Sequence, residues 1–142
     1  MFKQKNNNTE YIVNDQNHVV KGLDRGDTAE FLGIRYARGE RFKKPVLEPL
    51  AAEVTATKYG DGCPQLRQFF DESKSKSKTD MLYYTEFRKG LSFTYSEDCL
   101  NLNIFVPKNA ENLPVLLYIH GGAFVICSSD ERPFDGKEIA KE

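Results

Sequence analysis

Histidine, cysteine and long apolar runs are all scarce in this chain of 142 residues. Its two histidines and three cysteines show no zinc-binding spacing, which argues against a metal site. The odd number of cysteines, and the lack of an apolar leader in the opening "MFKQKNNNTE", indicate reduced thiols and a cytoplasmic location. No apolar run approaches the roughly 20 residues of a membrane-spanning helix, so we expect no membrane partner.

An excess of charge of one sign is also missing. Lys and Arg number 20 against 21 Asp and Glu, for a net charge of −1. This balance gives no general attraction to nucleic acid or to an anionic membrane, so we expect no nucleic-acid partner. With 39% hydrophobic and 12% aromatic residues, the chain has the composition of a folded domain.

The N-terminal half has several segments with the pattern of β-strands. In residues 10–22, "EYIVNDQNHVVKG", two β-branched runs flank a polar turn, which predicts an antiparallel hairpin. Residues 28–37 and 51–60 are further strand candidates. Pro45 and Pro49 lie between them and predict an extended, irregular connection.

Two more strands are expected in the second half. In residues 99–107, "CLNLNIFVP", leucine and isoleucine alternate with asparagine, as in a half-buried strand. Residues 115–119, "VLLYI", are continuously apolar, which is typical of a strand of a parallel sheet covered on both faces. A helix is expected to follow from Asp135, with Glu138 completing a capping box.

Residues 65–97 are interpreted as an irregular, aromatic-rich loop. They contain the low-complexity stretch "DESKSKSKTD", which predicts a solvated loop, together with an unusual number of Phe and Tyr residues. Because one incipient helix cannot cover both faces of a buried parallel sheet, the sequence indicates an incomplete α/β domain. We therefore expect residues 1–142 to be the N-terminal segment of a single larger domain, whose remainder is its partner.

The glycine pair that follows the apolar run 115–119 indicates the chemistry of this chain. "HGGAF", residues 120–124, follows a predicted strand, and glycine lets the backbone come close to a substrate. Backbone N–H groups in such a loop can stabilise the oxyanion of an acyl-transfer intermediate. The alternative is a purely structural role, in which Gly121 and Gly122 only form a turn.

Four segments, in order, closely resemble the type-B carboxylesterase family. They are "FLGIRYARGERFKKPVLEPL", "YGDGCPQ", "SEDCLNLNIFVP" and "HGGAF", which together span residues 31–124. Arg35 departs from the family pattern, in which proline is usual, and the "RGE" segment is short. The resemblance implies the N-terminal part of an α/β-hydrolase fold, in which an antiparallel hairpin leads into a mixed, mostly parallel sheet.

The resemblance also implies roles for individual residues. Gly121 and Gly122 supply oxyanion-hole N–H groups, and His120 is structural. Arg41 and Glu97 correspond to a buried ion pair, although two unrelated surface charges remain an alternative. Cys63 and Cys99 correspond to the cysteines that form a loop disulfide in secreted members; without a leader we expect them to be close together but reduced.

The nucleophile-elbow pattern Gly-x-Ser-x-Gly is absent from this sequence. The resemblance therefore implies a serine carboxylesterase acting on a small carboxylic ester through an acyl-enzyme, without a cofactor, whose nucleophile lies outside these residues. The 142-residue chain alone is predicted to be inactive. Two alternatives stay open, namely a non-catalytic esterase-like binding or adhesion module and an inert truncated fragment.

Overall fold

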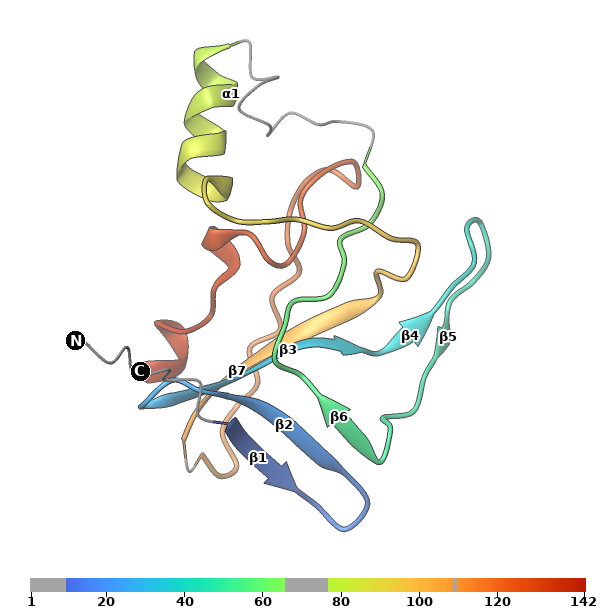
Figure 1. Ribbon diagram of the computed structural model, residues 1–142, viewed down its shortest axis with the longest axis vertical. Helices are drawn as coiled ribbons and strands as arrows, with labels where there is room; N and C mark the ends of the chain where they lie inside the picture. Colours follow the sequence, from blue (N-terminus) through green and yellow to red (C-terminus); the bar gives the residue numbers. More distant parts are fainter. Residues whose placement is uncertain (1–9, 66–76, 109) are drawn as a thin grey trace, which may run out of the picture.

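The computed structural model describes residues 10–65, 77–108 and 110–142. A five-stranded sheet forms its base, with β1, β2, β3 and β7 in that order and β6 beside β2 (Figure 1). The strands of this sheet are β1 (Glu10–Asn14), β2 (Val19–Asp24), β3 (Thr28–Arg35), β6 (Glu53–Thr55) and β7 (Asn101–Pro107). A separate pair, β4 (Ala37–Arg38) and β5 (Val46–Leu47), forms a projecting arm.

The predicted hairpin is confirmed as β1 and β2. Its turn is held by the Asp15 carboxylate, which accepts hydrogen bonds from the backbone N–H groups of Asn17 and His18, each at 2.7 Å. This is the local side-chain bonding that makes aspartate a common turn residue. The strands expected in residues 28–37, 51–60 and 99–107 are also present, as β3, β6 and β7.

Gly22 lies where β2 changes partner. The first half of β2 pairs in parallel with β6, and its last two residues pair with β3. A Cβ on Gly22 would lie 2.4 Å from the Glu30 carbonyl oxygen and 2.6 Å from the Phe31 ring, so only glycine fits. The Phe31 ring thus packs directly on the backbone of β2.

The core lies on one face of β3. Its buried members Ala29, Phe31 and Ile34 come from β3, and Ala56 follows β6. Partly buried side chains from four other strands pack against them; these are Tyr11, Val20, Val54, Leu102 and Val106. The core therefore joins the hairpin to β7, the strand that leads toward the glycine segment.

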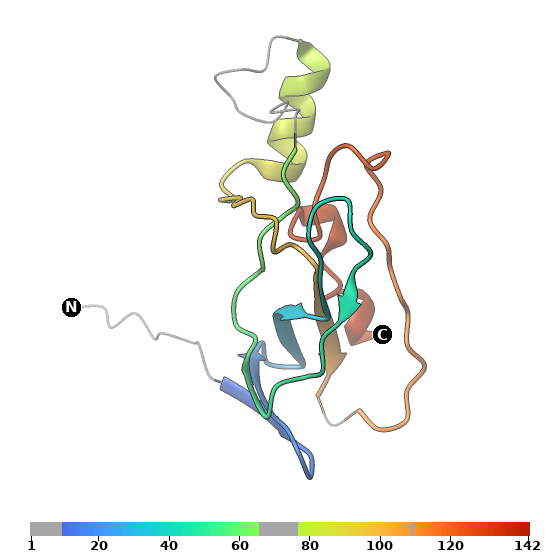
Figure 2. The ribbon, with the colours of Figure 1, turned by 90° about the vertical axis from the view of Figure 1, so that its right-hand side faces the viewer.

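The mostly parallel sheet that was expected is not found among the described residues. Each of β1, β2, β3 and β7 runs antiparallel to its neighbour in the sheet, and β6 is the strand that joins this sheet in parallel. Residues 115–119, expected to be a buried strand, have no strand assignment and are 65–91% exposed. A continuous apolar run is stable as a strand only with paired neighbours and covered faces, and the described residues provide neither. Figure 2 shows the segment (orange) along the outside of the molecule.

The helix expected from Asp135 is reduced to short turns. The 3-10 turns η2 (Arg132–Phe134) and η3 (Ile139–Lys141) flank it. Asp135 does accept a hydrogen bond from the Lys137 backbone N–H at 3.1 Å, as a cap would. Glu138 pairs instead with Lys141, and the Asp135 N–H donates to Arg132, so the capping box does not form.

Residues 65–97 are not wholly irregular. Helix α1 (Lys78–Tyr83) continues into a π-helical turn, η1 (Tyr84–Arg88), and stands above the sheet in Figure 1. Ser77 caps α1 by accepting a hydrogen bond from the Asp80 N–H at 3.0 Å. Much of the predicted low-complexity loop falls in residues 66–76, outside the described residues. In the described part of the chain, no helix has the length and hydropathy needed to cross a bilayer.

Candidate active site

The glycine segment forms a tight left-handed turn. The N–H groups of Val125 and Ile126 donate to the Gly122 carbonyl at 2.9 and 3.1 Å. Gly122, Ala123 and Phe124 have positive φ values of 121°, 53° and 58°. A positive φ is unfavourable for alanine and more so for phenylalanine. Backbone strain of this kind concentrates at functional sites.

The two glycines differ in how much space surrounds them. A Cβ on Gly122 would lie 2.0 Å from the Ile126 carbonyl oxygen, whereas one on Gly121 would meet nothing within 4 Å. The backbone N–H groups of Gly121 and Gly122 have no hydrogen-bond acceptor among the described residues. Both groups are therefore available to an oxygen atom outside this part of the chain.

His120 lies beside the turn. Its Nδ1 is 2.7 Å from the Gly121 carbonyl oxygen, and its ring centroid is 5.9 Å from that of Phe134. These contacts are consistent with the structural role inferred for His120. Among the described residues the imidazole makes no hydrogen bond to a carboxylate, as an acid–base triad would require, although its charge acts on Asp130 and Glu131.

A buried polar cluster lies on the inner side of the turn. Arg88 and Glu131 form an ion pair with 3.4 Å between Nε and Oε1, and their side chains are 6% and 0% exposed. The Tyr83 hydroxyl donates to Glu131 and contacts the Cys127 sulfur, both at 3.3 Å. The cluster links η1 to the segment that follows the glycine turn.

Burial shifts the acid–base properties of this cluster. It raises the pKa of Glu131 and of the neighbouring Asp130, because desolvation penalises a carboxylate. Arg88 opposes the shift at Glu131, and the Ser128 hydroxyl, which donates to Asp130, opposes it there. Burial also raises the pKa of the Tyr83 hydroxyl and the Cys127 thiol.

Arg41 and Glu97 are in contact, as the resemblance implied. The Arg41 guanidinium donates to Glu97 Oε1 through both Nε, at 2.9 Å, and a terminal nitrogen. The expected burial is wrong, because the side chains are 56% and 57% exposed. The pair joins the projecting arm to the segment before β7 but is screened by solvent.

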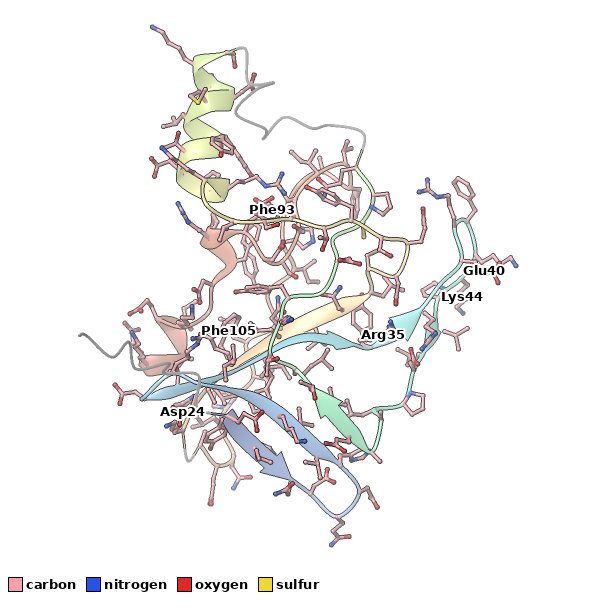
Figure 3. The ribbon with its side chains drawn as sticks, viewed as in Figure 1. Asp24, Arg35, Glu40, Lys44, Phe93 and Phe105 are labelled. Atoms are coloured by element: carbon pink, nitrogen blue, oxygen red, sulfur yellow. The ribbon has the colours of Figure 1, made fainter. Side chains whose placement is uncertain are left out.

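Arg35, the departure from the family pattern, also takes part in ion pairing. It contacts Asp98 and lies 4.0 Å from Glu48, which also binds Arg38 at 2.7 Å. Figure 3 shows Arg35 where β3 leads into the projecting arm, whose tip carries Glu40 and Lys44. Arginine here therefore replaces the rigidity of proline with charge pairing.

Cys63 and Cys99 are free thiols whose sulfur atoms lie 2.7 Å apart. Burial and the Cys63 thiol raise the pKa of Cys99 to about 12. Cys127 is buried at a separate place, against Tyr83. Cys63 and Cys99 thus bring together the two ends of the segment that contains α1. No three His, Cys, Asp or Glu side chains in the described ranges are grouped closely enough to hold a metal ion.

Solved structures that resemble this chain define its class of protein. The chain superimposes on a PNB esterase with a TM-score of 0.67 and 37% identity, covering 93% of this chain and 25% of that one. A Clostridium hathewayi esterase, described as able to hydrolyse aliphatic aromatic polyesters, gives 0.67 and 28%, covering 94% of this chain and 26% of that one. These structures are esterases of the α/β-hydrolase type.

The chain belongs to the carboxylesterase family, whose sequence profile matches residues 12–142. It is 36% identical to para-nitrobenzyl esterase of Bacillus subtilis, over 94% of this chain and 26% of that protein. It is 33% identical to carboxylesterase 1F of Mus musculus, over 87% of this chain and 22% of that protein. The chain therefore spans about a quarter of the length of these relatives.

The sequence did not indicate the buried cluster around Arg88 and Glu131. The two residues are 43 positions apart, and neither belongs to a motif of the resemblance. A charged residue in an aromatic-rich stretch is a weak signal, since most such residues are solvated.

Proposed function

We propose that this chain supplies the oxyanion-binding turn of a carboxylic ester hydrolase. In this proposal the N–H groups of Gly121 and Gly122 donate to the substrate oxygen as it becomes negative. A serine outside these residues attacks the ester carbonyl, the alcohol leaves, and water releases the acyl group. The left-handed turn with two unengaged amides, in a chain of the carboxylesterase family, is the observation that carries the proposal.

The rest of the machinery is proposed to come from a C-terminal part of the same domain. In support, the chain spans about a quarter of its relatives and its sequence has no Gly-x-Ser-x-Gly. The exposed apolar residues 115–119 are of strand length and would gain neighbours from such a part. A small carboxylic ester is the proposed substrate, no cofactor is required, and the cytoplasm is the proposed location.

A chimera tests this function directly. This chain would replace the corresponding N-terminal quarter of the Bacillus subtilis para-nitrobenzyl esterase, and p-nitrophenyl acetate hydrolysis and fluorophosphonate labelling would be measured. The chimera should be active and labelled, whereas the 142-residue chain alone should show neither property.

Two substitutions at Gly121 form a matched pair in the chimera. Gly121→Ala keeps the N–H and meets no neighbouring atom, so it should retain most activity. Gly121→Pro removes the N–H, and its kcat should fall about 10²–10³-fold, as for other lost oxyanion donors. Equal activity of a folded Gly121→Pro chimera and the Gly121→Ala chimera would contradict the oxyanion role.

A further inference from the structure

The left-handed turn needs support that it does not itself provide. Ala123 and Phe124 adopt positive φ, and Gly121, Ala123, Phe124 and Val125 are all exposed. A conformation that costs free energy persists only where surrounding structure imposes it. The inner side of the turn is the place where such structure can act.

Cys127 provides the contact on that inner side. A Cβ built on Gly122 would lie 3.2 Å from the Cys127 Cβ, so the two residues touch. Cys127 is 8% exposed and itself adopts a positive φ of 75°. The Gln65 side-chain amide donates to its carbonyl at 2.8 Å, and the Tyr83 hydroxyl lies 3.3 Å from its sulfur.

The helical segment 78–88 reaches the same place through Glu131. Tyr83 and Arg88 both contact the Glu131 carboxylate. Arg88 is fixed on its other side, where it donates to the Tyr95 hydroxyl at 2.8 Å and lies 3.8 Å from the Phe93 ring centroid. Figure 3 shows Phe93 just below α1, between the helix and the sheet.

A second arginine strengthens this attachment from the opposite direction. Arg132 donates to the Thr85 carbonyl at 3.4 Å and to the Lys89 carbonyl, both at the end of the helical segment. Arg132 is itself exposed, so these two bonds add less than the buried Arg88–Glu131 pair.

We propose that Arg88 and Glu131 are positioning residues, whose ion pair holds the Gly122 turn in its left-handed conformation through Tyr83 and Cys127. The helical segment 78–88 would then be a rigid support for the turn. The proposal rests on the proposed function only for its catalytic consequence, since the conformation of the turn can be measured without any substrate.

Amide hydrogen exchange, followed by NMR on the 142-residue chain, tests the proposal. The amides of Val125 and Ile126 report the turn because both donate to the Gly122 carbonyl. The amides of Leu32 and Ala56, which donate to Ala56 and Lys21 in the sheet, report the rest of the fold. In Arg88→Met, exchange at Val125 and Ile126 should accelerate at least about tenfold more than exchange at Leu32 and Ala56.

Arg41→Met is the matched control, because it makes the same substitution in an exposed Arg–Glu pair. Its turn amides should exchange at the original rate. Arg88→Lys keeps a cation beside Glu131 and should restore most of the protection lost in Arg88→Met. Failure of the lysine variant to protect better than methionine would contradict a role for the ion pair.

Unchanged exchange at Val125 and Ile126 in Arg88→Met, or equal acceleration at all four amides, would overturn the proposal. If Arg88→Met does not fold, Glu131→Gln is assessed by the same four amides, with the same expected contrast. An inactive chimera with the expected exchange pattern would refute the proposed function while leaving the positioning role intact.

Discussion

Two arginine–glutamate pairs in this chain differ mainly in their exposure to water. Arg41 and Glu97 are more than half exposed, whereas Arg88 and Glu131 are almost completely buried. Arg41→Met should therefore change the free energy of unfolding little, because water screens an exposed ion pair. Arg88→Met leaves a buried carboxylate without its ion-pair partner and should cost about 3–5 kcal/mol. Urea unfolding of both variants checks the contrast, which equal losses would contradict.

Asp130 and Asp24 should give opposite pH dependences. Burial raises the pKa of Asp130 in the folded chain. Its contribution to stability therefore falls as the pH rises above the pKa that Asp130 has in the unfolded chain. Lys108, at 2.5 Å, and the Gly26 N–H lower the pKa of Asp24, whose contribution is lost as pH falls.

Thermal unfolding at two pH values tests this difference. At about pH 7, Asp130→Asn should raise Tm and Asp24→Asn should lower it, and both effects should shrink as the pH falls toward about 3. A fall in Tm for Asp130→Asn at neutral pH would show that its bond with Ser128 outweighs the desolvation of the carboxylate.

The two glycines of the turn provide another contrast. Gly122→Ala places a Cβ 2.0 Å from the Ile126 oxygen at a positive φ, so it should cost about 1–3 kcal/mol in the free energy of unfolding. Gly121→Ala should change that free energy by less than about 0.5 kcal/mol, as at other open surface positions. Urea unfolding measures both values; similar values would mean that the turn rearranges at little cost.

Among the elements, local patterns predicted the strands well and the remainder poorly. Alternation and turn residues identified the strands that became β1, β2, β3, β6 and β7, because their neighbours lie within the described chain. Residues 115–119 have the composition of a buried strand, but strand formation depends on pairing that the pattern does not contain. The helical segment 78–88 was missed because its tertiary contacts, with Glu131 and Arg132, are distant in sequence.

The candidate site was likewise predicted only in part. Gly121, Gly122, and the Arg41–Glu97 and Cys63–Cys99 pairs were suggested by motifs, and the structure brings each pair together. The exposure of Arg41 and the buried cluster at Arg88 follow from how segments pack, which motifs do not describe. The sequence therefore indicated the site's backbone groups but not the contacts that support them.

The segment closed by Cys63 and Cys99 should respond to oxidation. Mild diamide treatment should join these sulfurs, which lie 2.7 Å apart, and leave buried Cys127 as a thiol. Closing a loop between cysteines 36 positions apart should raise the free energy of unfolding by about 3–4 kcal/mol in the chain-entropy model. Peptide mapping and urea unfolding check this, with Cys63→Ser as the control. A disulfide that includes Cys127 would contradict it.

For the molecule as a whole, the exposed apolar segment 115–119 is the main liability. Apolar surface of this extent favours association, so we expect the chain to self-associate as its concentration rises. Leu117→Lys should reduce association without loss of stability, because Leu117 is 77% exposed. Light scattering after size-exclusion chromatography measures this.

Leu47→Lys is the control for that experiment. Leu47 is 81% exposed on the projecting arm, away from the apolar segment. Its substitution should leave association unchanged. Equal effects of both substitutions would mean that general surface hydrophobicity, rather than residues 115–119, drives association.

The near contact of Cys63 and Cys99 has a consequence for protein engineering. A segment whose two ends meet leaves and re-enters the fold at one point, so its length can change while the flanking strands keep their positions. New sequence grafted between these cysteines would emerge beside the glycine turn. The chain therefore offers an attachment point that would place a binding peptide or small domain next to the glycine turn without redesign of the sheet.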